Sequence, residues 1–149
     1  MKDVARNRKA SHDYEIEDRV EAGLVLQGTE VKSLREGKAV LRDAYVTIRS
    51  GEAWMLNCHI AEYTHGNMQN HDPLRERKLL LHAREIEKLA RATAQKGYSL
   101  IPLRIYFKGS HAKVEVGVGR GRKSFEKRHA VREREDKLEM VRALKDRNR

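Results

Sequence analysis

The sequence predicts a mainly β fold, a small closed or partly open barrel with flanking helices and a basic C-terminal tail. Short runs in which apolar and polar residues alternate predict several strands, and turn residues separate these runs. Strictly alternating strand–helix units, which would predict a parallel sheet, are absent. With 149 residues, of which 39% are hydrophobic, the chain is predicted to hold one domain with a modest core.

The N-terminal half begins with a long strand and a short helix. Apolar residues at even positions over 14–26 predict a half-buried strand, with a bend or bulge at Gly23. Thr29 is predicted to cap the following helix, which ends before Gly37. Alternation over 44–48 and 54–60, separated by Ser50-Gly51, then predicts a hairpin.

The second half continues with a polar loop over 62–76, a length that is usually functional or mobile. Residues 79–81 predict a short buried strand, and the apolar spacing over 86–94 predicts a helix. Alternation over 101–107 predicts a strand that Pro102 places near a sheet edge, followed by a hairpin partner containing Val114, Val116 and Val118.

The charge is unevenly distributed along the chain, whose formal net charge is +10. Residues 1–12 carry a net charge of +3, residues 13–119 carry +1, and residues 120–149 carry +6. A nearly neutral body with two basic ends indicates two docking devices for a polyanion, most plausibly nucleic acid. The alternative is that both ends are merely solvated. For a basic protein, a barrel of the oligonucleotide-binding type is the natural member of the predicted fold class.

Three regions are therefore predicted: a basic arm over 1–12, an oligonucleotide-binding-like barrel over 13–120 and a basic tail over 121–149. The tail carries only a thin helical stripe of apolar residues, Val131, Leu138, Val141 and Leu144. Such a stripe buries little surface alone, so the tail is expected to be disordered when free and helical against a partner.

Metal and phosphate-loop chemistry are poorly supported. Cys58, His59, His65 and His71 lack the close pairs of zinc sites, so we expect Cys58 in the core and solvated loop histidines. Glycines 117, 119 and 121 follow a strand, but a basic stretch replaces the expected Walker-type ending. They are interpreted as a flexible basic hinge.

Catalysis and membrane insertion are not predicted either. No Gly-x-Ser-x-Gly elbow and no nucleophile with an evident base occurs, so the chain is expected to have no enzymatic activity and no cofactor. No run approaches the ~20 apolar residues of a membrane span, and the N-terminus lacks an apolar signal region. The single cysteine fits a reducing cytosol, which predicts a cytoplasmic protein without a membrane partner.

RNA-binding chemistry is better represented. A donor-rich segment suited to phosphate and base-edge contacts precedes the first long strand: Asn7, Arg8, Lys9 and His12. Arg35 and Lys38 lie near the end of the short helix, where they either contact RNA or simply offset the helix dipole. Glu21 and Glu30 either pair with a nearby cation or accept hydrogen bonds from amines or ribose hydroxyls.

The tail combines cations with one aromatic residue. Phe125 lies among Arg122, Lys123, Lys127, Arg128, Arg132 and Arg134. Its ring could stack on a base or anchor the tail on the body, and the sequence favours neither.

These residues resemble a known family. The runs Asn7–Tyr14, Glu21–Lys38, Arg77–Leu81 and Gly121–Arg128, together with Asp72-Pro73 and Gly97-Tyr98, are similar to SmpB, the bacterial tmRNA-binding family of trans-translation. The resemblance covers essentially the whole chain in order. The family commonly has Asp at the position of Glu126 and His or Tyr at the position of Phe125. Phe125 cannot form a hydrogen bond as His or Tyr can, so a role that needs a polar ring is lost at this position, whereas stacking on a base is retained.

The resemblance implies an oligonucleotide-binding-type barrel that binds the tRNA-like domain of tmRNA and no DNA. It also implies delivery to stalled ribosomes with elongation factor Tu and alanyl-tmRNA, the protein standing in for the missing anticodon arm. The tail would act in the small-subunit decoding centre and enter the empty mRNA channel as a helix. A ribosomal-RNA-binding structural protein without a rescue role is the alternative.

The resemblance also assigns site residues by position. Those on the tmRNA-binding side, or supporting it, are Asn7, Arg8, Lys9, His12, Glu21, Glu30, Lys32, Arg35, Lys38 and Leu80. Leu80 lies in an apolar run, so its role is expected to be mainly packing. Those in the ribosome-binding tail motif are Gly121, Arg122, Lys123, Phe125, Glu126, Lys127 and Arg128.

Overall fold

The structure is a computed structural model that describes residues 2–65 and 70–122. The strands are β1 (Asp3–Arg6), β2 (Tyr14–Leu24), β3 (Ala39–Val40), β4 (Tyr45–Arg49), β5 (Glu52–Leu56), β6 (His59–Ile60), β7 (Arg77–Leu80), β8 (Tyr98–Lys108) and β9 (His111–Gly121). The helices are α1 (Ala10–Asp13), α2 (Gly28–Arg35) and α3 (Ala83–Thr93).

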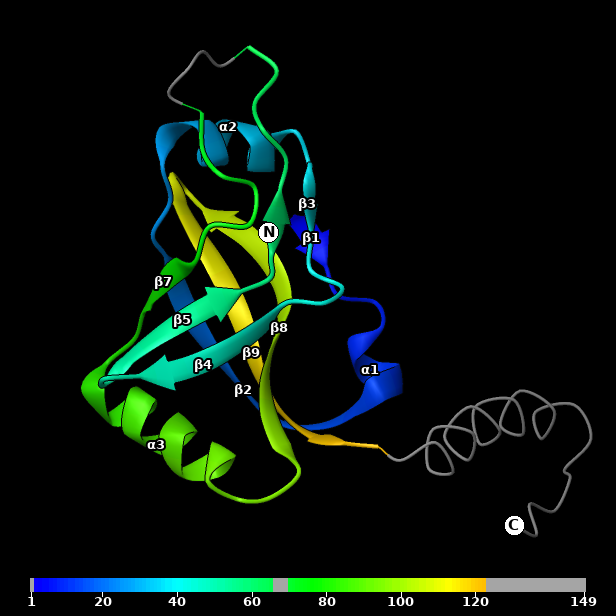
Figure 1. Cartoon of the computed structure of the whole chain (residues 1–149), viewed down its shortest axis with the longest axis vertical. Helices are drawn as coiled ribbons and strands as arrows, with labels where there is room; N and C mark the ends of the chain where they lie inside the picture. The colour runs from blue at the N-terminus through cyan, green and yellow to red at the C-terminus, as the bar shows by residue number, and fades with distance from the viewer. Residues whose placement is uncertain (1, 66–69, 123–149) are drawn as a thin grey trace, which may run out of the picture.

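The strands close a ring in the order β8, β4, β5, β7, β2, β9 and back to β8, with antiparallel pairing throughout. Closure removes the free sheet edges that would otherwise invite pairing with other chains. Helix α2 lies across one end of the barrel and α3 lies at the other (Figure 1). The prediction of a small, mainly β barrel with flanking helices is confirmed.

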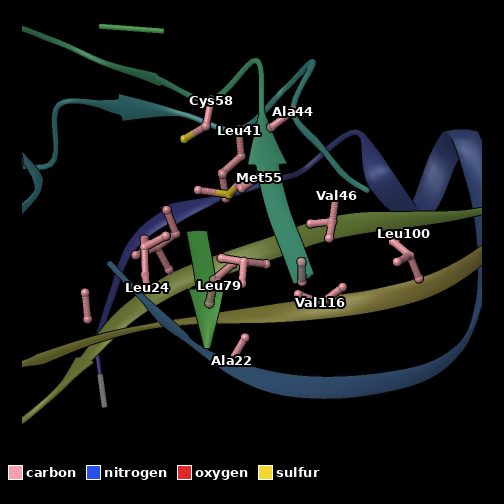
Figure 2. Packing of buried hydrophobic residues seen from close by; sticks show 14 of the residues in the cluster. Ala22, Leu24, Leu41, Ala44, Val46, Met55, Cys58, Leu79, Leu100 and Val116 are labelled. Carbon is pink, nitrogen blue, oxygen red and sulfur yellow. The ribbon is translucent and has the colours of Figure 1, made fainter. Parts of the chain in front are cut away.

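The core fills the barrel with the inward-facing residues of these strands. Val116 of β9, Leu79 of β7 and Met55 of β5 are at most 1% exposed and point toward one another (Figure 2). Cys58 packs in the same cluster, as the sequence predicted. The period-two alternation of the long strands places every second side chain here.

The glycines of β9 are a correction to the sequence interpretation. Gly117 and Gly119 lie inside a strand that is paired on both sides, with β2 and β8, so they form no hinge. A Cβ atom on Gly119 would lie 2.8 Å from Ile101 Cδ1 and 3.0 Å from Tyr14 Cβ. Glycine is therefore required here because side chains of both neighbouring strands pack across β9.

Two predicted irregularities lie elsewhere than expected. Gly23 pairs regularly within the ladder, and the β2 bulge falls between Ile16 and Asp18. Strand β8 is not an edge strand, since β9 pairs along one side and β4 and β1 pair along parts of the other. Pro102 pairs only with Val116 of β9 and flanks a bulge, a position that tolerates its missing N–H.

The predicted hairpins are confirmed, except that the second strand of the first hairpin ends earlier than predicted. Ser50 and Gly51 both have positive φ, 53° and 75°, as a tight two-residue turn between β4 and β5 requires. The second strand stops at Leu56 because Asn57 also adopts a positive φ of 58°. Beyond it, β6 pairs with β3 in a separate small sheet.

The N-terminal segment contributes a strand to the sheet. Strand β1 pairs with β8 alongside Arg104–Tyr106, and the Asn7 N–H extends this contact to Leu103 O at 2.8 Å. The stretch predicted as a basic arm, 1–12, therefore contains β1 and most of α1, which ends at Asp13. At the other terminus, β9 ends at Gly121, and the predicted tail helix lies outside the described residues.

Candidate nucleic-acid interface

Helix α2 is fixed at one end of the barrel by its sequence. Gln27, not Thr29 as predicted, occupies the N-cap, and its N–H donates to Glu30 Oε1 at 2.7 Å. Leu34 is fully buried and anchors the helix on the core. Gly37, with φ of 74°, ends the helix as predicted, because this left-handed conformation suits glycine.

A buried network of one carboxylate and two arginines attaches α2 to the barrel. The carboxylate of Glu30 accepts hydrogen bonds from Arg77 Nε at 2.7 Å and from Arg75 Nη2 at 2.6 Å. Glu30 and Arg77 are both 0% exposed. Of the two sequence alternatives for Glu30, the structure shows pairing with cations, and a fully buried carboxylate cannot contact RNA directly.

The pKa of Glu30 reflects this network. Burial alone would raise it, but the hydrogen bonds from Arg75 and the Gln27 N–H, with the charge of Arg77, bring the pKa below its ordinary value. The carboxylate is therefore charged at neutral pH and supports α2 as an anion.

The exposed face of α2 carries cations over aromatic rings. The guanidinium of Arg35 lies 4.1 Å from the centroid of the Phe107 ring, and Lys32 Nζ lies 5.5 Å from that of Tyr63. Within residues 2–65 and 70–122, neither cation has an ion-pair partner. Lys38, just beyond the helix, pairs loosely with Glu36 at 3.5 Å. This face can therefore offer positive charge to a phosphate without first breaking an ion pair.

A second group lies on the outer surface of β2, β7, β8 and β9. Glu21 accepts a hydrogen bond from the Tyr106 hydroxyl and lies 2.9 Å from Lys108 Nζ. These two hydrogen bonds lower the pKa of Glu21, so it stays ionised. Beside it, a surface pocket of about 470 Å³ is lined by Glu21, Leu80 and Lys113.

Leu80 corrects two sequence expectations. Its side chain is 56% exposed while its neighbour Leu79 is 1% exposed, because successive strand residues face opposite sides of the sheet. The run 79–81 is therefore not uniformly buried, and Leu80 is available for contact instead of serving mainly in packing. Gly23 lets it lie close to β2, since a Cβ there would be 3.2 Å from Leu80 Cβ.

The N-terminal candidates lie apart from α2, around α1 (Figure 1). Asn7 Nδ2 donates to Leu41 O and Pro102 O at 3.3 and 3.2 Å, so the amide is held in place between β1 and α1. His12 Nδ1 lies 3.0 Å from Asp13 Oδ1, and Lys9 Nζ lies 3.8 Å from the same carboxylate. Arg8 is exposed to solvent.

The root of the tail lies beside this N-terminal group. The Arg122 N–H donates to Asp13 O at 2.9 Å, and the Gly121 N–H donates to Gly97 O at 2.9 Å. The other tail candidates lie outside the described residues: Lys123, Phe125, Glu126, Lys127 and Arg128.

Sequence reasoning missed the residues that organise this surface. Tyr63 and Phe107 lie beneath the α2 cations, and Arg75 and Arg77 neutralise Glu30. The available signal was Arg77 at the start of an apolar strand, where a charge needs a buried partner. The aromatic residues gave no signal, since a strand phenylalanine is ordinarily a core residue.

The structure also locates the residues considered for a metal. Burial raises the pKa of the Cys58 thiol to about 11, so it is protonated at neutral pH and a poor ligand. His71 was expected to be solvated but is 3% exposed: its Nε2 donates to Ile60 O and its Nδ1 accepts from the Thr29 hydroxyl, each at 2.8 Å. Within the described chain, no three His, Cys, Asp or Glu side chains group as metal ligands would.

No helix of the described segments is long and apolar enough to cross a membrane. The fold is a closed antiparallel barrel, and the helix at one end presents two cations that lie over aromatic rings. These features define a small β-barrel protein with a surface suited to a polyanion. The chain belongs to the SmpB family, whose model, described as SmpB protein, matches residues 4–146.

Relatives and a solved structure agree with this assignment. SsrA-binding proteins of Bacillus cereus (strain AH820) and Bacillus anthracis are each 53% identical over 146 residues, covering 98% of this chain and 94% of theirs. That of Halalkalibacterium halodurans is 52% identical, covering 98% and 95%. A solved chain of "tmRNA-SmpB: a journey to the center of the bacterial ribosome" is 46% identical, with a TM-score of 0.70 over 85% of this chain and 93% of that one.

Proposed function

We propose that this chain binds the tRNA-like domain of tmRNA and delivers it to stalled ribosomes for trans-translation in the bacterial cytoplasm. Elongation factor Tu with alanyl-tmRNA is its companion in the delivery complex. The chain acts as a binding protein and not as an enzyme. Membership of the SmpB family, and relatives that are SsrA-binding proteins, support the proposal.

The observation that carries the proposal is the pair of unneutralised cations on α2. Lys32 and Arg35 are three residues apart, so they lie on one helix face, and each is positioned over an aromatic ring. Glu21 and Leu80 would extend the interface along the barrel, with Glu21 accepting hydrogen bonds from base amines or ribose hydroxyls. Residues 7–12 would act at the other side, near the tail.

The tail has the second task in this proposal. Residues 121–149 would act in the small-subunit decoding centre and the empty mRNA channel after docking. Backbone hydrogen bonds from Gly121 to Gly97 and from Arg122 to Asp13 fix the position on the barrel at which the tail begins. Truncation after Arg122 is therefore expected to preserve tmRNA affinity while abolishing peptide tagging on stalled ribosomes. Loss of tight tmRNA binding on truncation would contradict this division of labour.

A salt titration of tmRNA binding tests the α2 face. Each phosphate contact contributes roughly 0.7–0.9 to the slope of log affinity against log salt. We expect Arg35→Ala to lower both the affinity and this slope. The matched control is Arg91→Ala, an exposed arginine in the last turn of α3 at the opposite end of the barrel, which should change neither. Equal effects of the two variants would show that α2 does not contact the RNA.

A pair of adjacent leucines separates binding from folding. Leu80→Ala should weaken tmRNA binding without changing the free energy of unfolding, because the side chain is 56% exposed. Leu79→Ala should lower the free energy of unfolding by ~2–5 kcal/mol, as for other large-to-small core changes. A Leu80→Ala variant with unchanged affinity would remove this residue from the interface.

The identity of the RNA is tested most directly by sequencing what co-purifies with the full chain from a bacterial lysate. Enrichment of tmRNA is expected. Ribosomal RNA alone would instead indicate a structural ribosome-associated protein, and cleavage of labelled RNA by the purified protein would indicate a ribonuclease.

A further inference from the structure

The loop that follows β6 is attached to α2 at both ends. The Ser33 hydroxyl donates to Ala61 O at 2.7 Å, and the Thr29 hydroxyl donates to His71 Nδ1 at 2.8 Å. Ser33 and His71 are themselves buried. The two ends of this loop are therefore positioned by the same helix that presents Lys32 and Arg35.

Between these attachments, Asn70 fixes the backbone of Tyr63. Its Nδ2 donates to Tyr63 O at 2.8 Å, and its Oδ1 accepts from the Tyr63 N–H at 3.2 Å. All of these contacts use the backbone of Tyr63, so its ring is not needed to hold the loop. The ring also lies outside the hydrophobic core cluster.

The Tyr63 ring instead takes part in a polar, solvent-accessible arrangement. Lys32 Nζ lies 5.5 Å from its centroid, and the exposed His65 ring meets it edge-on at 5.4 Å with an interplanar angle of 71°. Lys32 is exposed and Tyr63 is half-buried, so this cation–ring contact contributes only about 1 kcal/mol, which gives little structural reason for the group. Its chemistry, a cation beside two aromatic rings that meet edge-on, matches what binds unpaired nucleobases on single-stranded RNA.

We propose that Tyr63 and His65, together with Lys32, form a stacking platform for one unpaired nucleobase of the RNA that binds α2. The platform rests on the proposed function and adds a base-contacting site to it. Lys32 holds the adjacent phosphate while the base stacks on the tyrosine or histidine ring. Because the hydrogen bonds at residues 29, 33 and 70 already position the loop ends, little ordering is required when the base binds.

Stacking and phosphate contact respond differently to salt, which allows a sharp test. Binding of a labelled tmRNA tRNA-like domain to the full chain is measured over a range of salt concentrations. Tyr63→Ala should weaken binding by about fivefold to 150-fold, the equivalent of ~1–3 kcal/mol per stacked base, with the salt slope unchanged. Lys32→Ala should instead lower the slope by roughly 0.7–0.9, one phosphate contact.

Matched variants control for the ring and for folding. Tyr63→Phe keeps the ring and should bind like the unaltered chain, whereas Tyr63→Leu keeps bulk without a ring and should bind like Tyr63→Ala. Thermal unfolding of the Tyr63 variants should match that of the unaltered chain.

Two outcomes would overturn the platform alone: Tyr63→Leu binding as well as Tyr63→Phe, or Tyr63→Ala altering the salt slope as Lys32→Ala does. Failure of the unaltered chain to prefer the tRNA-like domain over an unrelated hairpin of equal length would overturn the proposed function as well. The two failures are therefore distinguished within one experiment.

Discussion

Replacing Glu30 with glutamine should destabilise the protein strongly although the two side chains have the same size. The carboxylate accepts hydrogen bonds from the Gln27 N–H, from Arg75 and from Arg77. Glutamine keeps one acceptor oxygen but presents an NH₂ group where the other oxygen met a guanidinium. Arg77, which is 0% exposed, would then hold a buried charge without its counter-charge.

The expected loss is about 3 kcal/mol in the free energy of unfolding. Removing one partner of a buried ion pair typically costs ~3–5 kcal/mol, and the lower end applies because Arg75 is 29% exposed and can be hydrated. For a domain of this size, that corresponds to a fall in Tm of about 6–12 °C. Urea denaturation followed by circular dichroism measures the free energy, and an unchanged m-value would show that the unfolded state is unaltered.

Glu36→Gln is the matched control, since it makes the same change near the end of the same helix. Glu36 is exposed and lies 3.5 Å from Lys38, so its loss should cost no more than ~0.5 kcal/mol. If Glu30→Gln costs less than ~1 kcal/mol, the network does not hold α2.

The pH dependence gives the same prediction a second readout. The pKa of Glu30 is lowered in the folded protein from an ordinary value of 4.5. A lowered folded pKa means that the stabilisation is fully present above pH 4.5 and is lost as the pH falls through the folded pKa. The stability difference between the unaltered chain and Glu30→Gln should therefore shrink in acid below pH 4.5. A constant difference down to the acid-unfolding range would refute the assignment of the charge to Glu30.

Three further predictions concern the barrel. Gly119→Ala should lower the free energy of unfolding, measured by urea denaturation, by ~1–3 kcal/mol, because the added Cβ would meet side chains of both neighbouring strands. Gly28→Ala is the control and should be nearly neutral, since a Cβ there meets nothing within 4 Å. Tyr106→Phe should cost ~1–2 kcal/mol at neutral pH through the lost hydrogen bond to Glu21. Burial and this bond raise the pKa of Tyr106 from 10.0 to about 12, so the stabilisation is present below pH 10 and the two stability curves should converge between pH 10 and 12. Cys58 should react with a thiol reagent at pH 8 only as fast as the protein unfolds, and rapid labelling of the native protein would contradict its burial.

The parts of the fold that were predicted correctly are those determined by residues close together in the sequence. They include the alternation over 14–24, the alternation of Val114, Val116 and Val118, and the positive-φ turn at Ser50-Gly51, all of which depend on residues that are close in the chain. The same alternation would have exposed Leu80 beside Leu79, had the three consecutive leucines been treated as a two-sided strand. The glycines of β9 were misinterpreted because their reason lies in the side chains of other strands.

The support of the candidate site could not be predicted in the same way. Glu30 meets Arg77 across 47 positions of sequence, and Thr29 meets His71 across 42. The sequence predicted Thr29 as a helix cap and His71 as a solvated loop residue, because polar side chains are seldom buried unless paired, and it left the partner of Glu30 open. Only the closure of the barrel brings the partners together, so the charge of Arg77 in an apolar strand indicates that a buried partner is needed without identifying it.

Net charge illustrates the same point for function. The body over 13–119 is almost neutral in sequence, yet its ions are not evenly matched in space. On the outer barrel surface, Glu115 forms ion pairs with both Arg19 at 3.2 Å and Arg104 at 3.5 Å, so these charges neutralise one another within the sheet. On α2, by contrast, Lys32 and Arg35 contact aromatic rings and no carboxylate of the described segments.

A polyanion approaching the barrel therefore meets ion-paired cations along the strands, such as Arg19, Arg104 and Lys108, and two unpaired cations on α2. Pairing lowers the gain from a phosphate contact, since an existing ion pair must be broken or shared, whereas a cation over a ring remains free to bind. We therefore expect the orientation of a bound RNA to depend on which cations are already ion-paired and not on the total charge of +10. The basic ends, which dominate that total, can serve a separate surface because the described root of the tail lies beside α1, away from α2.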